Sequence, residues 1–184
     1  MWNKADHTES DTVDYNIMAI SGGGSHGAYG IGLIDGWYHR GDMPAFDVVT
    51  GISTGSIIST FVFLGNSHID HISKLYTQID TSDIYHYNFF KIFGGSSITS
   101  TRPLKSMLEQ NITPEILDEV AAEYRKGRRL YIGTLNIDTG HLVVWDMGAI
   151  AASGRPGSLD LYRNIIYASC AMPCWIIKQI RNLT

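Results

Sequence analysis

Residues 46–64 read FDVVTGISTGSIISTFVFL, and this stretch decides the fold. Phe46–Val49 is a short apolar run, typical of a buried strand. Gly51–Gly55 follows the pattern G-x-S-x-G, which predicts a tight turn with Ser53 at its centre. Ser56–Leu64 is apolar on nearly every side, as expected of a buried helix. A strand, a sharp turn and a helix in this order present a serine hydroxyl near the positive end of a helix.

The glycines at both ends of this pattern have a steric role. A side chain at Gly51 or Gly55 is expected to clash inside so tight a turn. The pattern alone is common by chance, but here a predicted strand precedes it and a predicted helix follows it. Ser53 is therefore the candidate nucleophile of a serine acyl hydrolase.

A second glycine-rich turn lies upstream, at residues 22–27, GGGSHG. It follows the apolar run Asn16–Ile20, a predicted strand, and a helical pattern continues from Ser25. Successive glycines after a strand let backbone amides turn toward one point, which makes an anion-binding nest. The amides concerned are those of Gly22, Gly23 and Gly24. Because parallel strands end at the same edge of a sheet, we expect this nest to lie beside Ser53.

The same glycine turn also fits the dinucleotide-binding pattern G-x-G-x-x-G. That pattern requires an acidic residue about 20 positions later, at the end of a second strand. Asp42 and Asp47 are near this spacing, but Asp47 precedes Val48 and Val49 rather than following them. A dinucleotide site is therefore the weaker alternative.

The rest of the chain predicts further alternation of helices and strands. Helices are expected at 69–79, from Thr113-Pro114 to Lys126-Gly127, and at 159–168, with strands at 130–135 and 142–145. Residues 81–101 form the least regular segment, and their aromatic residues either face a substrate or pack inward. The aromatic residues of this segment include Phe89, Phe90 and Phe93. The alternation predicts the α/β class with a mainly parallel sheet.

Composition and charge narrow the function classes. The chain has 184 residues, enough for one domain, with 44% hydrophobic and 17% charged residues. Fourteen basic and 18 acidic residues give a net charge of −4, which argues against nucleic acid as a partner. Residues 1–14 are a polar tail without the features of a signal peptide, and no apolar run reaches the length of a membrane span. We therefore expect a cytoplasmic or peripheral membrane location. Cys170 and Cys174 are interpreted as free thiols.

Three segments together resemble the patatin-like phospholipase family. They are residues 21–28 (SGGGSHGA), residues 49–56 (VTGISTGS) and residues 168–173 (ASCAMP), the last similar to the family's Ala-Ser-x-Ala-x-Pro segment. The resemblance covers about residues 16–173 and implies a domain at 15–173, followed by a divergent tail at 174–184. It implies a three-layer α/β/α fold and a Ser-Asp dyad acting on acyl esters of phospholipids or related lipids, without a metal or other cofactor.

The resemblance also assigns roles. Ser53 becomes the nucleophile and Gly22–Gly24 the oxyanion hole, with His26, Gly27, Gly51 and Gly55 supporting the two turns. His26 stands where the family often has Arg or Lys, so any positive charge there is expected to depend on pH.

One part of the family pattern is missing. The dyad aspartate belongs to an Asp-Gly-Gly or Asp-Gly-Ala motif downstream of residue 173, whereas the only Asp-Gly here is Asp35-Gly36. We expect the chain to be truncated at its C-terminal end. The substitute bases considered are Asp138, Asp146 and His141.

Without a base, a serine hydroxyl is a weak nucleophile, so an inactive domain that binds lipid or a partner is the alternative function. A third reading, an α/β-hydrolase triad, requires a late histidine, and none follows His141.

Overall fold

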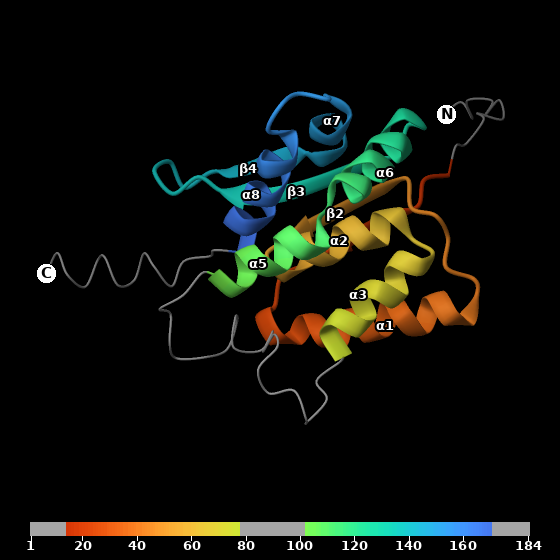
Figure 1. Ribbon diagram of the computed structural model, residues 1–184. Coiled ribbons are helices and arrows are strands. Elements are labelled where there is room, and N and C mark those ends of the chain that lie inside the picture. The colour runs from red at the N-terminus through yellow and green to blue at the C-terminus, as the bar shows by residue number, and fades with distance from the viewer. Residues whose placement is uncertain (1–13, 78–101, 171–184) are drawn as a thin grey trace, which may run out of the picture.

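The computed structural model describes residues 14–77 and 102–170, and Figure 1 shows their arrangement. Its centre is a four-stranded sheet in the order β1-β2-β3-β4. The strands are β1 (Ile17–Ile20), β2 (Val48–Ile52), β3 (Arg129–Leu135) and β4 (Leu142–Asp146). The first three are parallel and β4 is antiparallel to β3. The predicted α/β class with a mainly parallel sheet is confirmed.

The helices follow the strands along the chain. They are η1 (Gly24–His26), α1 (Gly27–Arg40), α2 (Thr54–Leu64), α3 (Ser67–Thr77), α5 (Arg102–Asn111), α6 (Pro114–Arg125), α7 (Met147–Ala152) and α8 (Ser158–Cys170). In the described part of the chain, no helix combines the length and the hydropathy that crossing a bilayer requires.

Among the described residues, the helices that connect the first three strands cover one face of the sheet. β1, β2 and β3 advance across the sheet in one direction, so right-handed crossovers place α1 and the helices between β2 and β3 on the same side. Val49, Leu130 and Ile132 point into this side and are fully buried. On the opposite face Ile17, Leu142 and Val144 are about three-fifths exposed among the described residues.

α2 is the central helix of the core. Every residue from Thr54 to Phe63 is buried, which the apolar pattern predicted. The hydroxyl of Thr60 nevertheless finds a partner, because it lies 3.0 Å from the hydroxyl of Tyr162 on α8. This buried bond ties α2 to α8, the two helices that meet at Ser53.

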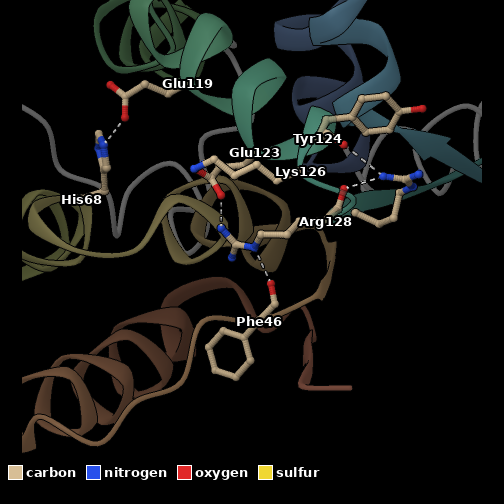
Figure 2. Close-up of polar contacts among 8 residues, drawn as sticks. Phe46, His68, Glu119, Glu123, Tyr124, Lys126 and Arg128 are labelled. Atoms are coloured by element: carbon tan, nitrogen blue, oxygen red, sulfur yellow. Dashed lines mark hydrogen bonds and ion pairs between the residues drawn. The ribbon is translucent and has the colours of Figure 1, made fainter. Parts of the chain in front are cut away.

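Polar contacts fix the edge of the sheet where β2 and β3 begin (Figure 2). The Arg128 guanidinium donates to the carbonyl of Phe46 at 2.7 Å and to the carboxylate of Glu123 at 2.9 Å. It also lies over the Phe63 ring, 4.5 Å from the ring centroid. Phe46 precedes β2, Glu123 lies in the last turn of α6 and Phe63 belongs to α2, so the Arg128 side chain joins three parts of the fold. Ser53 lies at the other edge, where β2 ends.

Several predicted boundaries were wrong. β2 runs through Gly51 to Ile52, and α2 begins at Thr54, so the turn is one residue rather than five. α5 and α7 were not predicted. The spacing of Leu104, Met107 and Leu108, all buried, was the available signal for α5. α7 has only six residues, too few for a periodic pattern.

Candidate active site

Ser53 is the only residue between the end of β2 and the start of α2. Its backbone has φ 55° and ψ −128°, a region that residues with a side chain rarely adopt. Such a conformation costs about 1–3 kcal/mol and persists only where surrounding contacts enforce it. The sharp turn expected from G-x-S-x-G is therefore present.

The two glycines of the pattern have no room for a side chain. A Cβ atom on Gly55 would lie 2.2 Å from the carbonyl oxygen of Ile20, at the end of β1. One on Gly51 would lie 2.5 Å from the carbonyl oxygen of Gly55. These neighbours are backbone atoms, which cannot rotate away. We call the turn at residues 51–55 the elbow. Both glycines are required because the elbow packs closely against the end of β1 and against its own backbone.

The structure brings the two glycine turns together. A Cβ atom on Gly22 would lie 2.8 Å from the Cβ of Ser53 and 3.4 Å from its Oγ. Gly27 packs just as tightly against the start of α2. A Cβ atom added to Gly27 would lie 2.3 Å from the methyl group of Thr54. The Thr54 hydroxyl also donates to the carbonyl of Gly24 at 3.2 Å. The loop after β1 thus rests directly on the elbow after β2.

The backbone of the glycine loop is partly fixed and partly free to bind. The carbonyl of Gly23 accepts from the backbone N–H of His26 at 3.0 Å, and it also lies 3.0 Å from Nδ1 of the His26 ring. The amides of Gly23 and Gly24 donate to no other residue within 14–77 and 102–170. Free amides beside a serine hydroxyl are what stabilisation of an oxyanion requires.

Sequence reasoning missed the residues that hold the Ser53 backbone. The N–H of Ser53 donates to Oγ of Ser169 at 2.8 Å. The carbonyl of Ser53 accepts from Oγ of Ser56 at 2.6 Å and from Sγ of Cys170 at 3.2 Å. Ser169 and Cys170 belong to the segment ASCAMP, which drew attention only through the family resemblance. Local pattern could not reveal the two contacts from α8, because more than 110 residues separate Ser169 and Cys170 from Ser53.

Buried groups around the elbow do not serve as bases at neutral pH. Burial raises the pKa of the Cys170 thiol to about 12, so the thiol stays protonated and donates its hydrogen. Burial, with a smaller contribution from the charge of Cys170, raises the pKa of Tyr76 well above its usual range. Tyr76 packs against Gly27, where a Cβ would lie 3.2 Å from its ring.

The structure places the three candidate substitute bases on β4 and in the turn between β3 and β4. Asp146 ends β4 and caps α7, its carboxylate accepting from the N–H of Ala149 at 2.8 Å. In the sheet, Asp146 is paired with Tyr131 of β3. Ile52, the residue before Ser53, is paired with Gly133, two residues further along β3. Asp138 and His141 are exposed in the turn between β3 and β4. Among the described residues, none hydrogen-bonds to the Ser53 hydroxyl.

One cluster of metal-ligand type lies on α1 and α3. His39 Nδ1 is 2.9 Å from the carbonyl of Asp35 and 3.6 Å from its carboxylate, while Nε2 is 3.4 Å from the carboxylate of Asp70. The carboxylates face opposite edges of the ring, which suits ion pairing between the helices better than a shared ion. His39 is about 18 Å along α1 from Gly27. The aromatic candidates Phe89, Phe90 and Phe93 lie outside the described residues.

Comparison with known proteins agrees with this geometry. A search of curated proteins found no match. Comparison with protein families matched residues 18–179 to the family described as patatin-like phospholipase. The match includes both glycine turns, Ser53 and the segment that holds its backbone. The chain belongs to the patatin-like phospholipase family.

Proposed function

We propose that the protein is a serine lipid acyl hydrolase in which Ser53 attacks the ester carbonyl of a phospholipid or related lipid. The observation that carries the proposal is the contact between the strained Ser53 turn and the loop at Gly22. Family membership supports a lipid acyl ester as the substrate class.

The reaction has two steps. Oγ of Ser53 bonds to the carbonyl carbon, and its proton passes to a general base, a carboxylate by the family's Ser-Asp dyad, as the tetrahedral oxyanion forms. The amides of Gly22, Gly23 and Gly24 stabilise that oxyanion. The base returns this proton to the alkoxide of the leaving group when the ester bond breaks. The lipid alcohol then leaves and an acyl-enzyme remains. Water attacks the acyl-enzyme, releases the fatty acid and regenerates Ser53.

Two exposed side chains support contact with a lipid surface. Tyr29, in the first turn of α1 after the glycine loop, is 80% exposed, and Leu33 one turn later is 65% exposed. We expect Tyr29→Ser to slow hydrolysis of phospholipid vesicles while leaving hydrolysis of a short, water-soluble ester unchanged. Equal slowing on both substrates would count against a role for this side chain at the lipid surface.

The test of the main proposal is reaction with a fluorophosphonate probe, followed by mass spectrometry of the labelled peptide. Labelling at Ser53 in the wild-type protein and none in Ser53→Ala is the expected result. Hydrolysis of a phospholipid or a short ester should be lost in the same variant. Equal labelling of both proteins would exclude Ser53 as the nucleophile.

A second candidate function is a catalytically inactive domain that binds lipid or a partner. The observation that favours it is the lack, among the described residues, of an acid or histidine bonded to the Ser53 hydroxyl. Sedimentation with phosphatidylcholine vesicles distinguishes the two. Vesicle binding without probe labelling, unchanged in Ser53→Ala, is the result expected of a binding module.

A further inference from the structure

Two residues in the last turn of α8 bond to the backbone of Ser53, one to its N–H and one to its carbonyl. Ser169 is 2% exposed, and its Oγ accepts from the Ser53 N–H at 2.8 Å while donating to the Gly133 carbonyl at 2.7 Å. One hydroxyl therefore links the elbow after β2 to the neighbouring strand β3. A hydroxyl can accept and donate at once, which no apolar side chain of this size can do.

The next residue acts on the other side of Ser53. Cys170 Sγ donates to the Ser53 carbonyl at 3.2 Å, and the same carbonyl accepts from the N–H and Oγ of Ser56 at 2.8 and 2.6 Å. Both polar groups of the Ser53 backbone are thus occupied by neighbours. These contacts restrain the residue whose φ of 55° is otherwise unfavourable.

We propose that Ser169 is a positioning residue, which holds the strained Ser53 turn so that its hydroxyl stays against the Gly22 loop. This inference rests on the proposed role of Ser53 as nucleophile. Ser169 touches the backbone of Ser53 and not its reacting oxygen, so it acts through orientation alone.

The expected consequence of losing the hydroxyl is specific. Ser169→Ala leaves the Ser53 N–H and the Gly133 carbonyl without their shared partner, and the turn gains freedom to rotate. A displacement of a reacting atom by about 1 Å can slow a reaction by about 10²-fold. The glycine loop is untouched, so probe binding should change far less than the bond-forming step.

Thr60→Val is the matched control. Thr60, like Ser169, is buried and its hydroxyl bonds across the α2–α8 contact, to Tyr162 at 3.0 Å. It makes no hydrogen bond to Ser53 in the described structure. The two substitutions therefore remove comparable buried hydroxyls from the same pair of helices, and only one of them reaches the elbow.

The first measurement is the rate of fluorophosphonate labelling as a function of probe concentration, which separates probe binding from the bond-forming step. We expect Ser169→Ala to lower the maximal labelling rate by about 10²-fold, while the probe concentration that gives half of that rate changes less than about threefold. Thr60→Val should be labelled at the wild-type rate. Equal slowing in the two variants, or no slowing in Ser169→Ala, would overturn the proposal.

The second measurement does not depend on reactivity. Hydrogen exchange of the Ser53 amide, followed by NMR, should be protected in the wild-type protein and faster by about tenfold in Ser169→Ala. A wild-type Ser53 amide that exchanges without protection would overturn the proposal even if Ser169→Ala does not fold. Protection that depends on Ser169 in a protein that the probe does not label would refute the proposed hydrolase and leave the positioning contact standing.

Discussion

Gly22→Ala is the substitution that most directly tests whether the two turns work together. The new methyl group would stand 2.8 Å from the Cβ of Ser53 and 3.4 Å from its Oγ. An optimal contact between carbon atoms is about 3.5–4.0 Å, so the methyl group is too close by about 0.7–1.2 Å. Ser53 cannot move into the core, because Gly55 already touches the end of β1.

The magnitude follows from that shortfall. If the Gly22 loop retreats by about 1 Å, the amides no longer face the oxygen that a reacting carbonyl would place there. The loss of one oxyanion donor slows acyl transfer by about 10²–10³-fold, and a misplacement of this size has a similar effect. The loop is exposed at Gly22, so the cost to stability should be small compared with the cost to reactivity.

The assay is the fluorophosphonate labelling rate, measured together with thermal unfolding. We expect the labelling rate of Gly22→Ala to be at least about 10²-fold lower than that of the wild type, while the variant still unfolds cooperatively. Gly36→Ala serves as the control, because a Cβ there meets no atom within 4 Å. Labelling of Gly22→Ala at the wild-type rate would refute the claim that this loop and Ser53 form one site.

Three further predictions follow from other parts of the structure. Gly36→Ala, on the exposed side of α1, should raise the free energy of unfolding by about 0.5–1 kcal/mol, as measured by urea titration. Asp146→Asn keeps a residue that caps helices equally well, so stability and probe labelling should both stay unchanged; a loss of labelling alone would identify Asp146 as a base. The folded-state pKa of Cys170 is raised from 9.0 to about 12, so its contribution to stability is complete below about pH 9 and is lost as pH rises toward 12. Urea titrations across this range should therefore show a decline that is steeper in the wild type than in Cys170→Ser, by up to about 1.4 kcal/mol per pH unit.

The sequence predicted the elements around Ser53 because their signals are local. Glycine at positions 51 and 55 and the apolar run from Ile57 to Leu64 are sufficient to indicate strand, turn and helix. The same reasoning placed the strand end too early, since it treated Gly51 as a breaker. In the structure Gly51 continues β2, and its missing side chain makes room for Gly55 and Ser59.

Most contacts between distant segments could not be predicted from local sequence patterns. The shared sheet edge predicted that the Gly22 loop and Ser53 would meet, because parallel strands impose that geometry. Nothing in the sequence indicated that Ser169 bonds to the Ser53 amide, since a serine near a helix end has many other uses. Asp146 was weighed as a base, although its position before Met147 also suited a helix cap, the role it has in the structure.

The strain at Ser53 explains why contacts from three other segments are needed to hold this one turn. A positive φ at a serine is unfavourable by about 1–3 kcal/mol, and an isolated turn would relax to a commoner conformation. Here Gly22 after β1, Gly133 in β3 and the last turn of α8 leave it no such freedom. Each of these contacts joins Ser53 to a segment distant in the sequence, so it exists only in the folded sheet. Reactivity at Ser53 should therefore be lost before global unfolding when the last turn of α8 loosens, because the N–H and the carbonyl of Ser53 both bond to that turn.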